Sequence, residues 1–315
     1  VGSEMCIRDR RPTAEGEYYI MREDLALRLE RFKEQRSVDA AAQGRVARPM
    51  VKFIGEEVLD TAVAALLQGE NLLLAGGKAT GKNVLADNLA WLFARPVFTA
   101  SFHVNTDSSM LIGTDTFTGG EVRLRRGPIA LAAQYGGFCV LDEINMAKND
   151  AVAVLHSVLD YRRLIDVPGY ECIPLHPATR FIATMNYGYA GTRELNEALT
   201  SRFVVIQMPP IAEDGLDRLL GEEFPTLEKK YRGQLVQLFL DLQKKCGSAE
   251  ISSKALDLRG MLDALRLMRR GVAAGAALDM GITNKAFDAY EQSLIRDVIA
   301  ARIPAKLDRS RLFTD

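Results

Sequence analysis

The stretch "NLLLAGGKATGKNVLADNLAWLF" at residues 71–93 decides the fold class. It joins a short apolar run, a glycine-rich loop and a helical pattern. The loop matches the pattern G-x-x-x-x-G-K-[ST] at Gly76, Gly81 and Lys82, and then breaks it, because Asn83 stands where Ser or Thr is expected. In a strand–loop–helix setting, such a loop aims backbone N–H groups and a helix N-terminus at phosphate groups. An ordinary glycine-rich turn is the alternative interpretation.

A second stretch, "GGFCVLDEIN" at 136–145, makes that alternative much weaker. Four apolar residues ending in Asp142 and Glu143 predict a buried strand that delivers two carboxylates to the carboxyl edge of a sheet, where α/β proteins bind ligands. We expect Asp142 to hold Mg²⁺, directly or through a water, and Glu143 to polarise an attacking water. An incidental acidic pair at a strand end is the competing interpretation.

Short apolar runs alternate with helix-like segments over the first two thirds of the chain, which predicts a parallel sheet covered on both faces. The runs are "NLLLA" (71–75), "VFTASF" (97–102), "FCVL" (138–141), "RFIATM" (180–185) and "FVVIQM" (203–208). After Pro209 and Pro210 the strand signals stop, and residues 212–302 show the patterns of several helices. We therefore expect a domain boundary near residue 210.

The region before the loop is predicted to be helical. Residues 22–36 place Leu25, Leu29 and Phe32 on one helical face, residues 37–49 have the composition of a linker, and a second helix is expected at 56–68. "EMCIRD" within residues 1–10 resembles a translated sequencing adapter, so we treat these residues as an artefact and expect the natural N-terminus to be missing. The predicted organisation is a helical extension and linker (11–49), an α/β nucleotide-binding domain (50–210), a helical lid (211–303) and a tail (304–315).

Composition narrows the functional class. The 315 residues contain 48% hydrophobic residues, with 40 basic and 41 acidic side chains for a net charge of −1. No overall basic field is present to hold nucleic acid or anionic lipid. The four cysteines include no C-x-x-C pair, and no apolar run reaches the roughly 18 residues of a membrane span. These features favour a cytoplasmic protein without membrane contact.

Two longer runs carry a family resemblance. "LDEINMAKNDAVAVLHSVLDYRRLIDVPG" and "HPATRFIATMNYGYAGTRELNEALTSRF" resemble the AAA+ ATPases of the MoxR and CbbQ/NorQ/GvpN type, which are relatives of the dynein and midasin motor modules. The resemblance covers roughly residues 50–270, with five motifs in the family's order. It implies an AAA+ P-loop NTPase core, in which a five-stranded parallel sheet lies between helices, followed by an all-helical lid domain.

The same resemblance assigns roles to single residues. Asn186 in "ATMN" is similar to the sensor-1 residue that positions the attacking water, and Arg202 in "LTSRF" to the arginine finger offered to a neighbouring subunit. Arg259 is similar to the sensor-2 arginine of the lid, and "KFIGEEV" at 52–58, with Ile54 and Gly55, to the segment near the adenine. The remaining nucleotide-binding residues implied are Gly76, Gly77, Lys78, Ala79, Thr80, Gly81, Lys82, Asn83 and Val84.

From the residues alone, other interpretations of these positions stay open. Asn186 has the alternative of a loop-capping amide, and Arg202 that of a cation favoured by a helix C-terminus. Arg259 has the alternative of a surface arginine, with Lys254 as a nearby rival. Asn83 departs from the family's usual Ser or Thr, but its carbonyl is a neutral oxygen that Mg²⁺ accepts. We favour a working site with an altered metal contact.

Residues 112–136 contain the signature of a β-hairpin that turns at Gly119 and Gly120. In the resembled family such a hairpin is inserted in the second helix and faces the pore of a ring. The expected function is a Mg²⁺-dependent ATPase that forms a ring, commonly a hexamer, and remodels a partner protein, with a von Willebrand factor A-domain protein as a frequent partner. The alternatives are a module that binds ATP without turnover and a nucleic-acid motor of the McrB type, which the neutral net charge disfavours.

Overall fold

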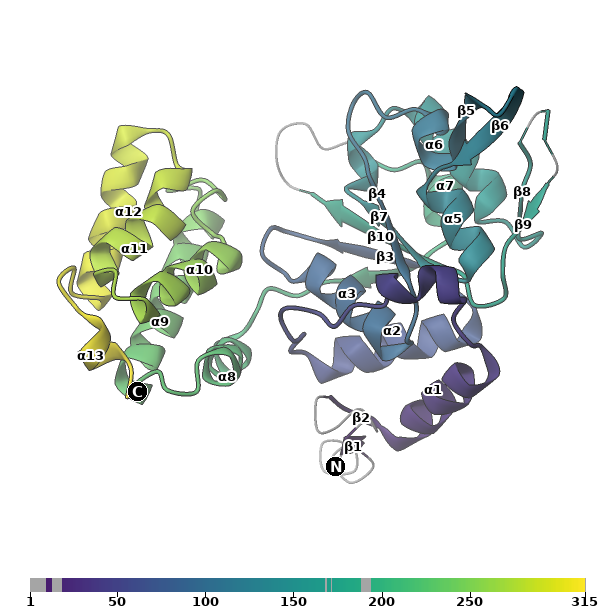
Figure 1. Cartoon of the computed structure of the whole chain (residues 1–315). Coiled ribbons are helices and arrows are strands. Elements are labelled where there is room, and N and C mark those ends of the chain that lie inside the picture. Colours follow the sequence, from purple (N-terminus) through teal and green to yellow (C-terminus); the bar gives the residue numbers. More distant parts are fainter. Residues whose placement is uncertain (1–9, 13–18, 168, 171, 188–193, 315) are drawn as a thin grey trace. The chain divides into compact units, whose positions relative to one another are not determined.

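The structure is a computed structural model that describes residues 10–12, 19–167, 169, 170, 172–187 and 194–314. The chain divides into two compact units, and the boundary after the sheet falls between Pro209 and Pro210. The first unit is a sheet covered by helices and the second is helical (Figure 1). Residues 1–9, most of the stretch that we treat as an artefact, lie outside the described residues.

The first unit is built on a five-stranded parallel sheet, as predicted. Its strands are β3 (Leu72–Gly76), β4 (Val97–Ser101), β7 (Phe138–Asp142), β10 (Arg180–Asn186) and β11 (Val204–Gln207). Their order across the sheet is β11-β3-β10-β7-β4, so β10 lies between β3 and β7. All five residues of β3 are buried, which explains its unbroken apolar run, because both faces of a parallel sheet are covered. The carboxyl ends of β3, β7 and β10 therefore meet at one edge.

Helices cover both faces of the sheet (Figure 1). One buried cluster joins the sheet to α1 (Glu23–Gln35), α2 (Glu56–Gln68) and α3 (Lys82–Leu92). The other joins it to α4 (Ser108–Ile112), α5 (Pro128–Tyr135), α6 (Asn149–Val158) and α7 (Glu197–Thr200). The predicted apolar face of α1 is confirmed, since Leu25, Leu29 and Phe32 are buried in the first cluster.

The segment expected to be a linker is partly ordered. It contains a 3₁₀ helix, Ala40–Arg45, whose first turn is capped by Asp39, with the Asp39 carboxylate accepting a hydrogen bond from the backbone N–H of Ala41 at 2.8 Å. Side-chain capping of this kind satisfies backbone groups locally and does not require an apolar periodicity. The sequence pattern therefore missed it.

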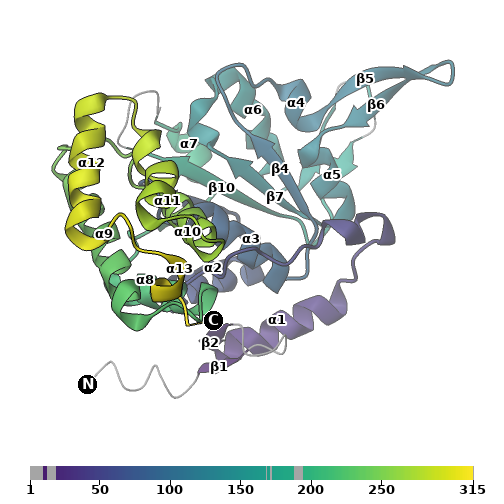
Figure 2. The same ribbon diagram turned by 60° about the vertical axis from the view of Figure 1, so that its left-hand side comes forward.

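The predicted hairpin is confirmed. β5 (Gly113–Thr118) and β6 (Glu121–Arg126) pair antiparallel between α4 and α5, and Figure 2 shows the hairpin projecting beyond these helices. Gly119 and Gly120 both have positive φ, 66° and 88°, which a two-residue hairpin turn of this hand requires. Two shorter antiparallel pairs complete the unit, β1 (Arg10–Pro12) with β2 (Ile20–Arg22) and β8 (Leu164–Ile165) with β9 (Ile173–Pro174).

The second unit has a core of its own. Its helices are α8 (Glu213–Glu223), α9 (Lys229–Gly247), α10 (Leu258–Arg269), α11 (Ala274–Gly281), α12 (Ala289–Arg302) and α13 (Arg309–Leu312). The segment expected to be a tail contributes buried Leu307, Leu312 and Phe313, and Phe313 bridges to Leu227. So few apolar residues in a short segment do not form a recognisable helical pattern. Among the described residues, no helix has the length and apolarity needed to cross a bilayer.

Candidate nucleotide-binding site

The glycine-rich loop leads from the end of β3 into α3, as its sequence predicts. Ala79 and Gly81 take positive φ, 59° and 80°, and α3 begins at Lys82. The Lys82 ammonium lies within the curve of the loop, where Nζ donates to the carbonyls of Gly76 at 2.9 Å and Gly77 at 2.6 Å. Burial lowers the pKa of Lys82 to about 8, while the charges of Asp142 and Glu143 act in the opposite direction. The loop thus holds one desolvated cation at a helix N-terminus.

Asp142 ends β7, and its carboxylate is held from two sides. Its Oδ1 accepts hydrogen bonds from Oγ1 of Thr184 at 2.7 Å and from Nδ2 of Asn83 at 3.1 Å. Among the described residues, its Oδ2 accepts no hydrogen bond, and neither does the amide oxygen of Asn83. Asp142 and Asn83, the two predicted metal ligands, are therefore in contact, and Oδ2 of Asp142 and Oδ1 of Asn83 remain available.

Glu143 has an unusual backbone conformation for its residue type, with φ of 55°. Its backbone N–H donates to Thr184 Oγ1 at 3.0 Å, and its Oε1 accepts from Nδ2 of Asn186 at 3.0 Å. A left-handed backbone at a residue other than glycine persists only where its surroundings hold it, and such positions cluster at functional sites. Here Thr184 binds the Glu143 backbone and Asn186 orients the Glu143 carboxylate.

Asn186 ends β10, and its position is fixed by its backbone as well as by its side chain. Nδ2 of Asn145, which is 2% exposed, donates to the Asn186 carbonyl at 2.8 Å. The Asn186 side chain itself donates to the Glu143 carboxylate, so its backbone and its side chain have separate partners. The assignment of Asn186 as the residue that positions the attacking water stays a prediction.

The segment with Ile54 and Gly55 is attached to the loop through Phe53. A Cβ built on Gly55 or on Gly81 would lie 3.1 Å or 3.4 Å from the Phe53 ring, so both backbones pass close to it. Asn88, which is completely buried in α3, accepts from the Phe53 N–H at 2.9 Å and donates to the carbonyl of Val51 at 2.9 Å. Asn88 thereby ties the segment before α2 to the helix that follows the loop.

Arg202 follows α7, and its guanidinium donates to the carbonyl of Ala198 in that helix. In the single chain the side chain thus acts as a cation at a helix C-terminus, which was one of its two interpretations. The assignment of Arg202 as an arginine finger toward a second subunit stays a prediction.

Arg259 is exposed on the first turn of α10 in the helical unit. Lys254, in the segment before α10, is exposed as well. The glycine after it has a packing role, since a Cβ on Gly260 would come within 2.0 Å of the carbonyl oxygen of Gly281 in α11. A glycine at position 260 is therefore explained by the close approach of α10 and α11.

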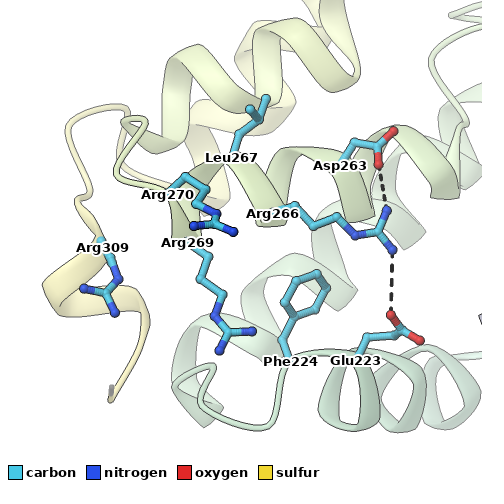
Figure 3. A pocket seen from close by; sticks show the side chains of 8 residues that line it. All are labelled: Glu223, Phe224, Asp263, Arg266, Leu267, Arg269, Arg270 and Arg309. Atoms are coloured by element: carbon cyan, nitrogen blue, oxygen red, sulfur yellow. Dashed lines mark hydrogen bonds and ion pairs between the residues drawn. The ribbon is translucent and has the colours of Figure 1, made fainter. Parts of the chain in front are cut away.

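The helical unit also contains a cavity of about 1110 Å³ (Figure 3). Arg266 on its wall pairs with Asp263 at 2.8 Å and Glu223 at 3.7 Å. Burial raises the pKa of Glu223, and the charge of Arg266 opposes that rise. None of the predicted nucleotide-binding residues lines this cavity, which is completed by Phe224, Leu267, Arg269, Arg270 and Arg309.

Sequence reasoning missed three residues of the site: Thr184, Asn145 and Asn88. Each is a polar side chain that is nearly or completely buried, at 1%, 2% and 0% exposure. Thr184 lies two residues before Asn186 in "FIATMN" and Asn88 interrupts an apolar helix, so a search for polar residues inside apolar runs would have found both. The site residues that they bond, such as Phe53 for Asn88 and Asp142 for Thr184, lie 35 and 42 residues away and could not be read from the sequence.

Comparisons with known proteins agree with this geometry. Residues 71–203 match the family described as the AAA domain, dynein-related subfamily. The chain is 30% identical over 291 residues to the uncharacterized protein YojN of Bacillus subtilis (strain 168), covering 91% of this chain and 95% of YojN. The chain belongs to the dynein-related subfamily of AAA domain proteins. Its motifs are accordingly those of an AAA+ ATPase family, and nucleotide binding is a property of that family.

Two further likenesses were found. The uncharacterized protein SAB1265c of Staphylococcus aureus (strain bovine RF122 / ET3-1) is 33% identical over 248 residues, which cover 77% of this chain and 94% of that protein. The solved structure of a RuvB mutant of Thermotoga maritima has a TM-score of 0.44 and 18% identity, covering 85% of this chain and 96% of that one.

The donor set fits the magnesium ion that the family implies. Within the described residues, no group of three or more His, Cys, Asp or Glu side chains could cage a metal by itself. Mg²⁺ does not need such a cage, because it usually keeps several waters and binds one or two carboxylates together with phosphate oxygens. Asp142 Oδ2 and Asn83 Oδ1, both without hydrogen-bond partners among the described residues, are donors of that kind.

Proposed function

We propose that this protein is a Mg²⁺-dependent ATPase that works in a ring and uses ATP hydrolysis to remodel or activate a partner protein. The observation that carries the proposal is the joining of Asp142 and Glu143 through Thr184, beside Lys82 and Asn186. A chain that had lost turnover would have no need to hold Glu143 in a left-handed conformation. The arrangement has the parts that phosphoryl transfer to water requires.

Each residue has a defined task in this proposal. Lys82 gives up its contacts with the loop carbonyls and binds the outer phosphates of ATP, joined by the backbone N–H groups of the loop. Asp142 and Asn83 would hold Mg²⁺, and the ion would neutralise charge on the phosphates. Glu143 accepts a proton from the attacking water, and Asn186 keeps the Glu143 carboxylate in place.

The ring, the partner and the location are inferred at the level of the resembled family. Arg202 and Arg259 are assigned to the γ-phosphate of a neighbouring subunit and to the lid side of the nucleotide. We infer a hexamer of MoxR type in the cytoplasm, acting on a protein substrate, with a von Willebrand factor A-domain protein as the partner. The near-neutral net charge supports a protein substrate over nucleic acid.

A second function, nucleotide-gated assembly without turnover, is favoured by one observation. Asn83 replaces a hydroxyl that touches both the metal and its aspartate, and a long amide could misplace the metal. A second observation argues against the assembly function: the Asn83 amide can contact both Asp142 and a metal, because Nδ2 donates to Asp142 while Oδ1 stays available. We therefore favour turnover.

The experiment that separates the two functions is the substitution Glu143→Gln. It preserves shape and the contact with Asn186 but removes the proton acceptor, so phosphate release should fall by a factor on the order of 10² or more. ATP binding, measured by equilibrium fluorescence with a labelled analogue, should stay near wild type. Glu34→Gln on exposed α1 is the matched control. Wild-type chain that binds ATP and releases no phosphate would establish the assembly function instead.

A further inference from the structure

Four arginines gather at the edge of the sheet opposite to the nucleotide site. Arg95 precedes β4 by two residues, Arg180 is the first residue of β10, and Arg163 precedes β8 by one. Arg36 directly follows α1. Because β4, β7 and β10 are parallel, their amino ends lie together at this edge, while Asp142 and Asn186 end strands at the other.

Arg95 and Arg36 are joined and incompletely bonded. Arg95 is 1% exposed; its Nη2 donates to the Arg36 carbonyl at 2.7 Å and its Nε to the Ala94 carbonyl at 3.0 Å. Its Nη1 is buried and has no hydrogen-bond partner among the described residues, and the same holds for Nε of Arg36. Burying an N–H of a charged group without a partner is costly. Each guanidinium therefore has a donor still to be satisfied.

Arg180 and Arg163 bring two more charges to the same place. Arg180 and Arg36 lie against one ring, with their Cζ atoms 5.9 Å and 4.5 Å from the centroid of Phe32. Arg163 and Arg180 both donate to the carbonyl of Thr179, at 3.1 Å and 2.8 Å. These contacts form a continuous chain of cations from Arg95 to Arg163.

The charge of this cluster is not balanced. None of the four arginines forms an ion pair in the described parts of the chain. The pKa of Arg180 is lowered to about 10, because its guanidinium is buried and because the charges of Arg163 and Arg36 oppose its own; Glu70 acts in the opposite direction. Backbone carbonyls satisfy many of the N–H groups but carry only partial charge. Waters could bond the two unsatisfied N–H groups without neutralising the cluster.

A cavity of about 340 Å³ borders this cluster at Arg36, the member of the four that lines it; its other lining residues are Gln35, Ser37, His176 and Pro177. His176 Nδ1 accepts from the backbone N–H of Ala178 at 3.1 Å, which leaves Nε2 as the donor of the neutral ring. Its ring is packed against Gly136, where a Cβ would come within 2.3 Å. The pKa of His176 is lowered by burial and by the charges of Arg95, Arg36 and Arg163.

We propose that this cavity binds a phosphate-type oxyanion, either inorganic phosphate or the phosphoryl group of a small phosphomonoester. Guanidinium groups are the preferred partners of such anions, since their planar forks bond two oxygens at once. The His176 imidazole supplies a further donor. With each water occupying about 30 Å³ of liquid, the cavity has room for a phosphate and a small organic part. The site is separate from the glycine-rich loop and independent of ATP turnover.

The test uses the nuclear magnetic resonance signals of the chain's three histidines, His103, His156 and His176. The full chain is titrated at constant pH and ionic strength with inorganic phosphate and, separately, with methyl phosphate. Bound anion should move the His176 signal saturably towards that of the protonated ring, because a nearby negative charge raises an imidazole pKa by about one unit. The same response should survive in Lys82→Ala, which weakens the competing site in the loop.

Arg36→Gln should raise the half-saturating phosphate concentration by roughly tenfold or more, which is the change expected for the loss of one charge-assisted hydrogen bond. Arg31→Gln, at an exposed arginine in the last turns of α1, is the matched control and should bind like the wild type. Saturation by phosphate identifies the free anion as the ligand, and saturation by methyl phosphate alone identifies a phosphomonoester. A response that chloride reproduces at equal ionic strength, or that is equal in the Arg36 and Arg31 variants, overturns the proposal.

Discussion

Thr184→Val tests whether one hydroxyl holds the two acidic residues of the site. Thr184 is 1% exposed, accepts from the Glu143 N–H at 3.0 Å and donates to the Asp142 carboxylate at 2.7 Å. Valine has nearly the same shape, so the substitution removes both hydrogen bonds without opening a cavity. The lost bond to a carboxylate and the unsatisfied N–H together should cost about 2–4 kcal/mol of unfolding free energy.

The assay is urea unfolding followed by tryptophan fluorescence. The chain's single tryptophan, Trp91, lies in α3, so its signal reports the sheet unit. With a urea dependence of roughly 2 kcal/mol per molar, the midpoint should fall by about 1–2 M. ATP turnover should fall as well, because Glu143 loses the bond that maintains its left-handed backbone.

The matched control is Thr99→Val, at an exposed position of β4 whose side chain makes no hydrogen bond among the described residues. This substitution should change the unfolding free energy by no more than about 0.5 kcal/mol. If Thr184→Val and Thr99→Val share one midpoint and one rate of turnover, the Thr184 hydroxyl does not organise the site and the reasoning fails.

Three further predictions concern single residues of the site. Asn83→Thr should keep or raise ATPase activity, whereas Asn83→Ala should require more Mg²⁺; equal Mg²⁺ dependence in all three proteins would remove Asn83 from the metal site. The folded pKa of Lys82 is about 8, below its ordinary 10.5, so ATP affinity should fall as pH rises above about 8, by up to roughly tenfold per pH unit. Lys82→Arg should abolish this pH dependence. An unchanged pH dependence in Lys82→Arg would mean that the Lys82 ammonium does not bind the phosphates. ATP turnover per subunit should rise with protein concentration, and concentration-independent turnover by a monomer would exclude the ring. Mixing Arg202→Ala with Glu143→Gln should restore part of the activity lost in each, because a mixed interface joins an intact Arg202 to an intact Glu143.

Local sequence was sufficient for most of the fold. The apolar runs predicted all five strands of the sheet. The central strands β3, β7 and β10 are largely apolar because both of their faces are covered, whereas the outer strands β4 and β11 also carry exposed residues. The spacing of glycines and Lys82 predicted the strand–loop–helix, and Gly119–Gly120 predicted the hairpin, because these backbones need positive φ. Local sequence missed the 3₁₀ helix capped by Asp39, the sparse apolar contacts in 304–314 and the short strand pairs β1–β2 and β8–β9.

The site was predicted only in part for a different reason. Lys82, Asp142, Glu143 and Asn186 follow recognisable patterns, since each lies at the end of a strand or the start of a helix at the ligand edge. That one buried threonine would join Asp142 to Glu143 depends on β10 lying beside β7, which no local pattern specifies.

The sequence did not predict that these four arginines cluster. Arg36, Arg95, Arg163 and Arg180 lie far apart along the chain, and each by itself resembles a solvated surface charge. Folding brings them to the amino edge of the sheet, where β4 and β10 begin, and places them together without a carboxylate in an ion pair among the described residues. The charges counted along the chain nearly cancel, whereas the tertiary structure concentrates positive charge at one edge, because parallel strands start together wherever they stand in the chain.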